Sequence, residues 1–289
     1  MRQIALYTTL ALGITLSACS GPKPTKPNVK TQKTMEISNK QKVVDLLKSI
    51  ETGAHEPAGY INPNKYIQHN LGVADGLEGF GAVLQQLPPN SAKANIVRVF
   101  QDGDFVFTQT DYNFFGPKIG FDLFRFENGK IVEHWDNLQE KPHVPNPSGH
   151  TMIDGATTIT DLNKTEDNKT LVRQFVNDIL VNGKMDMIGN YIDGENYIQH
   201  NPQIADGLSG LGQAFEYMAS QGITMTFSKI HKVLGEGNFV LSISEGSFAG
   251  NPTSFYDLFR VDQGKIVEHW DVIQTIPAQS EWKNSNGKF

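Results

Sequence analysis

The octapeptide Gly-Lys-Ile-Val-Glu-His-Trp-Asp occurs twice in this chain, at residues 129–136 and again at residues 264–271. Apolar and polar residues largely alternate along it, and a period of two is typical of a β-strand. In both copies Asp-Leu-Phe-Arg precedes it, at residues 122–125 and 257–260, and the glycine that begins the octapeptide belongs to the turn that connects the two segments. The octapeptide is therefore predicted to be the last strand of a β-hairpin.

The repeat extends well upstream of this hairpin. Tyr-Ile-Gln-His-Asn occurs at residues 66–70 and 197–201, and Ala-Asp-Gly-Leu occurs at residues 74–77 and 205–208. The motifs keep their order, and the spacing between copies grows only from 131 residues at the first motif to 135 at the hairpin. A period above about 100 residues indicates a duplicated domain and not a solenoid. A chain of 289 residues is long enough for two domains.

Each copy begins with helical periodicity. Ser38 and Gln41 form a capping box before the first helix. A short helical segment is expected to end near Tyr-Ile-Gln-His-Asn, and a further helix is expected over 77–87 and 208–219. The apolar residues at helical spacing in the first helix are Val43, Leu46, Leu47 and Ile50 in one copy and Val172, Phe175, Val176 and Ile179 in the other.

Strand periodicity follows the helices. In the first copy, strands are predicted over 95–100, 105–110, 121–126 and 130–137. Helices followed by a run of strands favour an α+β fold over alternating βαβ units. The boundaries that we predict are a signal peptide at 1–18, a tether at 19–37, domains at 38–140 and 165–277, a linker at 141–164 and a tail at 278–289.

The N-terminus has the pattern of a targeting signal. A positive start precedes an apolar stretch at 4–16, which is too short to span a bilayer permanently. The sequence then reads Leu-Ser-Ala-Cys and resembles a bacterial lipobox, which implies cleavage before Cys19 and its lipidation. Cys19 is the only cysteine, and a Pro-rich tether follows it. We expect a protein anchored through Cys19 on the extracytoplasmic side of a bacterial envelope. Ser20 favours the outer membrane, and an ordinary secretory peptide is the alternative.

Composition excludes several function classes. The net charge is −6, no stripe of Lys and Arg is present, and nucleic-acid binding is therefore not expected. The chain has no P-loop, no Gly-x-Gly-x-x-Gly and no zinc-type spacing of Cys and His. We therefore predict neither a metal nor a cofactor.

Two turn geometries are compatible with the first hairpin, and they differ in which residue faces Asp122. A two-residue type I′ turn at 128–129 places Asp122 opposite Trp135, whereas a three-residue loop with its glycine in the left-handed region places it opposite His134. The second copy has Gln263 in the turn, and glutamine is a poor residue for the positive φ of type I′. We therefore predict the three-residue loop.

This register places two carboxylates and an imidazole on one face of each hairpin, beside aromatic residues. Such groups are costly to bury unless they are hydrogen-bonded or line a wet cavity. Clusters of this kind also shift pKa values enough for acid–base catalysis, although polar strand ends that are simply solvated are the alternative. The opposite face is predicted to carry Leu123, Ile131 and Trp135. The predicted sets are Asp122, Phe124, Val132, His134 and Asp136 in the first copy and Asp257, Phe259, Val267, His269 and Asp271 in the second.

With these motifs, residues 38–140 and 165–277 each resemble the SnoaL-like polyketide cyclase family of the nuclear transport factor 2-like superfamily. The resemblance implies two tandem cone-shaped domains, each a curved, mainly antiparallel sheet wrapped around about three helices, with a pocket between them. It also implies general acid–base chemistry by Asp136 or Asp271 without a metal or cofactor. His134 or His269 is expected to have an orienting or polarising role, with Asp122 or Asp257 as its partner. The ligand-binding residues expected by resemblance are His69, Asn70, His200, Asn201, Phe124 and Phe259.

The function that follows from these observations is acid–base chemistry on a small apolar molecule, of the cyclase, isomerase or hydratase kind. A non-catalytic carrier or a scaffold is the alternative, and a helix C-terminus is the alternative for the two His-Asn pairs. The domains are expected to pair through their sheets as an intramolecular pseudo-dimer, from which a further oligomer can form. The rims at 112–120 and 245–254 differ, so the two pockets either prefer different ligands or one of them is degenerate.

Overall fold

The computed structural model describes residues 36–87 and 91–289, and residues Ile37–Phe289 form one compact unit. The predicted signal peptide, Cys19 and nearly all of the tether lie outside the described residues. Among the described helices, none has the length and apolar character that a membrane crossing requires.

The first domain has the helix-then-strand order that its sequence predicts. Helix α1 (Asn39–Thr52) begins where Ser38 Oγ accepts a hydrogen bond from the Gln41 backbone N–H at 3.2 Å. A 3₁₀ turn (Glu56–Tyr60), the short strand β1 (Ile67–Gln68) and helix α2 (Gly76–Gln85) follow. The remaining strands are β2 (Lys93–Asp102), β3 (Phe105–Asn113), β4 (Pro117–Glu127) and β5 (Lys130–Glu140).

The second domain repeats this order with small changes. Three short 3₁₀ helices of the second domain lie at Leu162–Lys164, Met185–Asn190 and Gly194–Asn196. Another short 3₁₀ helix follows the sheet at Gln279–Glu281. Helix α3 (Thr165–Phe175) continues into a π-helical turn (Val176–Val181), whereas α1 is α-helical throughout. The other elements are β6 (Ile198–Gln199), α4 (Gly207–Ser220), β7 (Met225–Glu236), β8 (Phe239–Phe248), β9 (Asn251–Asp262) and β10 (Lys265–Thr275).

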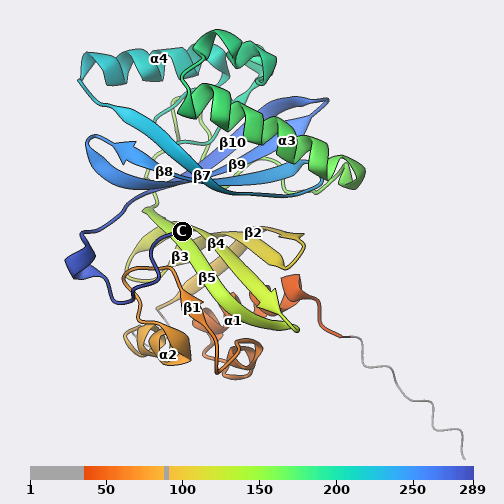
Figure 1. Cartoon of the computed structure of the whole chain (residues 1–289), viewed down its shortest axis with the longest axis vertical. Helices are drawn as coiled ribbons and strands as arrows, with labels where there is room; N and C mark the ends of the chain where they lie inside the picture. The colour runs from red at the N-terminus through yellow and green to blue at the C-terminus, as the bar shows by residue number, and fades with distance from the viewer. Residues whose placement is uncertain (1–35, 88–90) are drawn as a thin grey trace, which may run out of the picture. The chain divides into compact units, whose positions relative to one another are not determined.

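Each domain contains one five-stranded sheet, ordered β1-β5-β4-β3-β2 and β6-β10-β9-β8-β7. All neighbours are antiparallel except the short first strand, which runs parallel to the last one. Helices cover one face of each sheet (Figure 1) and enclose a buried apolar cluster with it. The predicted α+β fold with two tandem domains is confirmed.

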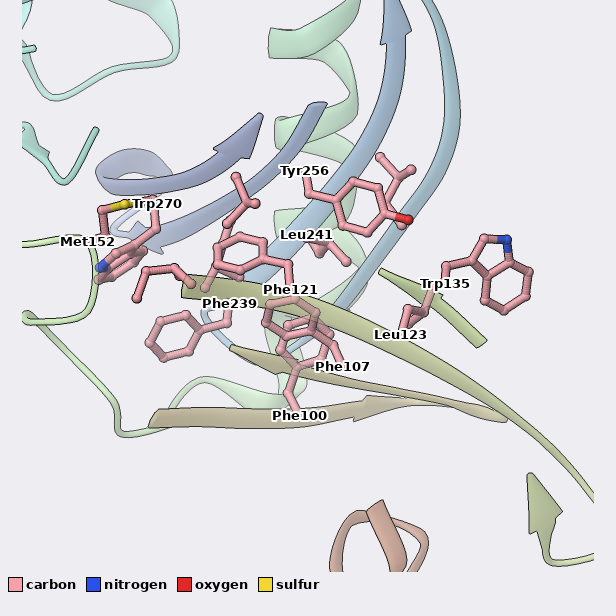
Figure 2. Packing of buried hydrophobic residues seen from close by; sticks show 14 residues of the cluster. Phe100, Phe107, Phe121, Leu123, Trp135, Met152, Phe239, Leu241, Tyr256 and Trp270 are labelled. Carbon is pink, nitrogen blue, oxygen red and sulfur yellow. The ribbon is translucent and has the colours of Figure 1, made fainter. Parts of the chain in front are cut away.

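The other faces of the two sheets share one apolar cluster. Phe107, Phe121 and Trp135 of the first sheet and Leu241, Tyr256 and Trp270 of the second are all buried in it. Figure 2 shows aromatic rings from both sheets meeting in this layer. Both tryptophans are thus packing residues at the contact between the sheets.

Polar contacts between the domains come in reciprocal pairs. Lys40 of α1 forms an ion pair with Glu236 at 2.9 Å, and Lys169 of α3 forms one with Asp102 at 2.7 Å. In the same way Arg98 lies 4.0 Å from the ring of Trp270, while Lys232 lies 4.3 Å from the ring of Trp135. These four contacts are matched in the opposite direction, whereas Asn137 Nδ2, which donates to the Ser254 and Val272 carbonyls, has no counterpart because Val272 occupies its position in the second domain.

The predicted hairpin register is wrong in both copies. The turn has two residues, with positive φ at Asn128 (49°) and Gly129 (73°), and Gln263 (48°) takes the same conformation despite its side chain. A one-residue bulge between the pairs Phe126–Ile131 and Arg125–Glu133 then shifts the strand, so that Asp122 pairs with Asp136. Ile131 consequently packs on the helix side, not with Leu123 and Trp135.

The wrong register changes which residues pair across the hairpin, but it does not change the face of the sheet on which their side chains lie. The observed pairing differs from the predicted one by two residues, and two residues are a full period of a strand. The side chains of Asp122, Phe124, His134 and Asp136 therefore still share one side, as they do in the second copy.

Candidate functional site

The second domain brings two carboxylates and an imidazole together on the helix side of its sheet. Asp257 of β9 and Asp271 of β10 are directly paired across the strands, and His269 is paired with Phe259 one step along. All three polar side chains are buried, and one ligand-type atom of each lies within 4.8 Å of the others. Like charges directly opposite each other on a sheet repel, so the cluster needs partners that compensate this repulsion.

The segment Tyr-Ile-Gln-His-Asn supplies these partners. It is not a helix end, because strand β6 lies parallel to β10 and positions Gln199 beside His269. Gln199 Oε1 accepts hydrogen bonds from the Asn201 backbone N–H at 2.9 Å and from His269 Nδ1 at 3.0 Å. Asn201 Nδ2 in turn donates to Asp271 Oδ2 at 2.7 Å. The repeated pentapeptide thus supplies the hydrogen bonds that hold the strand residues in place.

The His269 ring lies between Gln199 and Asp257 and is in hydrogen-bond reach of both. Nδ1 donates to the amide oxygen of Gln199, so the other ring nitrogen, Nε2, faces Asp257 Oδ1 at 3.1 Å. A hydrogen bond at this distance requires a proton on one of the two partners. The imidazole also stacks on Phe259, with ring centroids 4.8 Å apart, which fixes its orientation.

Asp271 has the electrostatic properties of a proton donor and acceptor. Burial raises its pKa, the Asp257 carboxylate adds to the rise, and His269 and the Asn201 amide oppose it. Its Oδ1 and the Oδ2 of Asp257 are buried and have no hydrogen-bond partner among the described residues. Two carboxylate oxygens are therefore available to a ligand.

These groups line a mostly apolar cavity of about 760 Å³. Asp257, His269 and Asp271 all line it, together with the side chains of helices α3 and α4 and of the π-helical turn. The size is that of a small-molecule site. Its apolar wall includes Phe175, Ile179, Leu180, Leu211, Phe215, Met218, Phe227 and Phe255.

The first domain repeats the cluster almost atom for atom. His134 Nδ1 lies 3.0 Å from Gln68 Oε1, His134 Nε2 lies 3.2 Å from Asp122 Oδ1, and Asn70 Nδ2 donates to Asp136 Oδ2 at 2.7 Å. Burial raises the pKa of Asp122, although hydrogen bonds from His134 and other neighbours oppose the rise. The shared framework is therefore a property of the repeat.

Two neighbours distinguish the first cluster from the second. Tyr112 donates a hydrogen bond to Asp122 Oδ2 at 2.9 Å, and its ring lies across Gly120, where an added Cβ would come within 2.5 Å of it. Lys288 is buried with its Nζ 2.6 Å from the Asp136 carbonyl and 3.8 Å from Asp136 Oδ1. A protein hydroxyl and an ammonium thus occupy the ligand-accepting side of this site.

The corresponding positions of the second domain exchange large and small residues. Gly246 and Phe255 lie where the register places Tyr112 and Gly120 in the first domain. Gly246 is required because an added Cβ would lie 1.8 Å from the Thr226 carbonyl oxygen. The Phe255 ring stacks on Phe227 at the cavity wall, 4.2 Å between centroids. The aromatic ring therefore lines the cavity and leaves the carboxylate free.

His69 and His200, which we expected in the ligand pocket, do not join the clusters. Their rings stack on Trp135 and Trp270 at 4.7 and 4.6 Å, on the side of the sheet that faces the other domain. This correction follows from the strand period, because successive residues of β1 and β6 point to opposite faces. Each ring also pairs with a strand glutamate, Glu133 or Glu268.

The remaining predicted residues lie where the sequence places them. Asn70 and Asn201 contact the aspartates, and Phe124 stacks on His134 as Phe259 does on His269. Gln68, Gln199 and the tyrosines at the start of the pentapeptide were missed. Their repetition in both copies was the available signal.

Comparison with known proteins returned structural similarity only. No protein-family model matches this chain, and no curated protein matches it. An NTF2-like protein of unknown function from Cytophaga hutchinsonii is similar over 37% of this chain and 94% of its own, at 17% identity and a TM-score of 0.32. A putative polyketide cyclase from Streptomyces antibioticus covers 34% of this chain and 89% of its own, at 20% identity and a TM-score of 0.30. An epoxide hydrolase-like protein from M. tuberculosis covers 38% and 85%, at 24% identity and a TM-score of 0.30.

Proposed function

We propose that the second domain carries out cofactor-free acid–base chemistry on a small apolar molecule, of the cyclase, isomerase or hydratase kind. The observation that supports this proposal is the convergence of Asp257, His269 and Asp271 on the mostly apolar cavity, with carboxylate oxygens left free. A raised pKa brings a carboxylate closer to the value at which it exchanges protons efficiently near neutral pH.

Asp271 is the residue that we assign to proton transfer. Its carboxylate takes a proton from a carbon next to a substrate carbonyl and returns it to the product, while the contact between His269 and Asp257 holds the neighbouring groups in position. The Tyr197 hydroxyl lines the same cavity, and burial, with Asp271 and Asp257 adding to it, raises its pKa well above the ordinary value. Tyr197 therefore stays protonated and is available to donate to the substrate oxygen.

The first domain supports this assignment by contrast. Its cluster is geometrically the same, but Tyr112 donates a hydrogen bond to Asp122 Oδ2, and Lys288 Nζ lies 3.8 Å from Asp136 Oδ1, which has no hydrogen-bond partner among the described residues. We infer that the first domain is a structural partner that has kept the hydrogen-bond framework. The reciprocal contacts between the sheets support an intramolecular pseudo-dimer, because a two-fold interface repeats every contact.

A carrier remains the second candidate, because most of the cavity wall is apolar. We also propose a location: the protein is lipid-anchored at Cys19 in a bacterial cell envelope and is extracytoplasmic, with the periplasmic side of the outer membrane favoured. A Cys19→Ser variant that stays membrane-bound and acylated would rule out this anchor.

An experiment that does not require the natural substrate tests the chemistry. The protein is incubated in D₂O with a panel of small apolar ketones and enones, and deuterium incorporation is followed by mass spectrometry. We expect Asp271→Asn to slow exchange by roughly 10²- to 10⁴-fold, the contribution of a general acid–base residue. The matched Asp136→Asn variant is expected to keep the rate.

The outcomes distinguish the candidates. Loss of deuterium exchange only in the Asp136→Asn variant would show that the active site lies in the first domain. Equal exchange in all proteins would remove the acid–base proposal, and small molecules that co-purify equally with the parent protein and Asp271→Asn would then favour the carrier.

A further inference from the structure

A second cluster of ionisable residues lies outside the cavity, where the segment between the domains crosses the second one. His150 and Asp154 belong to this segment, and His200 follows β6. His200 Nδ1 lies 2.7 Å from Asp154 Oδ1, and His150 Nδ1 lies 3.7 Å from Asp154 Oδ2. One ligand-type atom of each residue lies within 4.8 Å of the other two.

Carboxylates hold the far nitrogen of both histidines. His150 Nε2 lies 3.1 Å from Asp206 Oδ2, and His200 Nε2 lies 2.9 Å from Glu268 Oε1. Metal-ligating histidines characteristically donate their other ring N–H to a carboxylate, which orients the ring and fixes the tautomer. Here both histidines direct Nδ1 toward one shared carboxylate and have Nε2 held from behind.

Both ring nitrogens of His200 face acceptors. Nδ1 faces the Thr151 carbonyl oxygen at 2.9 Å and Asp154 Oδ1, and Nε2 faces Glu268. The ring is fully buried and stacked on Trp270, so it cannot turn toward water. With an N–H at Nε2 directed to Glu268, the ring presents the Nδ1 lone pair to a cation, as metal-ligating histidines do.

We propose that His150 Nδ1, His200 Nδ1 and the Asp154 carboxylate bind a divalent transition-metal ion, with Zn²⁺ as the best match. Two imidazoles and one carboxylate are a ligand set that suits zinc, and the Thr151 carbonyl or a water completes four-coordination. The half-exposed side chains of His150 and Asp154 leave a path for the ion.

The ion would hold the inter-domain segment in place where this segment forms part of the cavity rim. Asn146 Nδ2 donates to the carbonyls of Gln199 and Ile204, and Pro147 lines the cavity. Arg98 of the first domain donates to the Asp154 carbonyl at 2.6 Å. Metal binding at this point therefore links the inter-domain segment, the cavity rim and the contact between domains.

The first domain offers an internal control. The segment 283–289 crosses it as the inter-domain segment crosses the second domain, with Asn284 and Gly287 spaced like Asn146 and Gly149. At the position that corresponds to His150 it has Lys288, and His69 Nδ1 faces only the Gly287 carbonyl, at 2.8 Å. An ammonium group has no lone pair to donate to a metal, so this copy lacks the second imidazole ligand.

The test uses the full chain without a polyhistidine tag. Zn²⁺ is titrated by calorimetry, and bound Co²⁺ is monitored by its visible absorption, with metal content per chain measured after dialysis. We expect one saturable site, which His150→Lys and Asp154→Asn abolish and which Asp206→Asn weakens by roughly 10- to 100-fold. His55→Lys, the same substitution at an exposed histidine elsewhere, is expected to bind like the parent protein.

Two results would overturn the proposal. The first is the absence of a one-to-one site in the parent protein. The second is a site that survives His150→Lys and Asp154→Asn but disappears in Asp271→Asn, because the ion would then lie in the cavity. Circular dichroism of each variant separates lost binding from lost folding.

Discussion

The two domains carry the same cluster of Asp, His and Asp on the same strands, but the surroundings of the two clusters differ. In the second domain the cluster lines a cavity of about 760 Å³, whereas in the first Tyr112 donates a hydrogen bond to Asp122 and Lys288 lies 3.8 Å from Asp136 Oδ1. Two strand positions contribute to the difference: Tyr112 with Gly120 in one domain, and Gly246 with Phe255 in the other. A duplicated hydrogen-bond framework is therefore compatible with different surroundings, because the aromatic ring contacts the carboxylate in one domain and lines the cavity in the other.

The largest effect that tests this comparison concerns the sheet-to-sheet contact. Trp270→Ala and Trp135→Ala each remove a buried indole, which typically costs about 3–5 kcal/mol of the free energy of unfolding. We expect Trp270→Ala to cost more, because its Nε1 also donates to the Asp154 carbonyl at 3.0 Å, whereas Nε1 of Trp135 has no partner among the described residues. Urea unfolding measures both values, and equal costs would contradict the asymmetry.

A second test removes the hydroxyl that satisfies the first cluster. Tyr112→Phe leaves Asp122 Oδ2 without its donor, and an unsatisfied buried polar group costs about 1–3 kcal/mol. Exchange activity in the second domain is expected to be unchanged. Tyr217→Phe on an exposed tyrosine is the control. An unchanged free energy of unfolding in Tyr112→Phe would show that this hydroxyl does not stabilise the fold.

The next effect is a pH dependence of stability. Folding raises the pKa of Asp271 above its unfolded value, chiefly through burial, so the folded state favours the protonated form and loses stability as pH rises through the raised pKa. Asp271→Asn removes this loss. We expect the variant to be more stable than the parent protein above the raised pKa and equally stable below the unfolded one. Thermal unfolding across pH measures the difference.

The pKa of Glu133 is shifted in the opposite direction to that of Asp271. Burial alone would raise its pKa, but hydrogen bonds from His69 and Arg125 outweigh burial and lower it. Its contribution is therefore present above the unfolded pKa and is lost as pH falls through the lowered one. Glu133→Gln should destabilise the protein at neutral pH, whereas Asp271→Asn stabilises it. A change in the free energy of unfolding with the same sign in both variants would contradict the opposite pKa shifts of the two residues.

The smallest effect concerns the reciprocal ion pairs. Lys40→Gln breaks a pair with Glu236 whose side chains are 34% and 21% exposed, and such pairs contribute about 0–1 kcal/mol. Lys169→Gln should cost more because Lys169 is only 16% exposed and contacts both Asp102 and Glu166. Both costs should fall with added salt. A larger cost for Lys40→Gln would contradict this ranking of the two ion pairs.

The sequence by itself determined the duplication, the order of helices and strands and the face on which Asp122, His134 and Asp136 lie, because the strand period survives a shift of two residues. It did not determine the register, because the bulge at Val132, between the pairs Phe126–Ile131 and Arg125–Glu133, has no signal in the turn residues. It also predicted His69 and His200 on the wrong side, because short strands that pair in parallel with distant strands have no local signal.

Only the tertiary structure decided the different surroundings of the two clusters. Tyr112 reaches Asp122 from the neighbouring strand, and Lys288, which is distant in sequence, reaches Asp136 because the segment 283–289 packs on the first domain. The same holds for His150, which meets His200 only because the inter-domain segment folds back over β6. Such sites depend on long-range packing, and identical octapeptides therefore belong to chemically different surroundings.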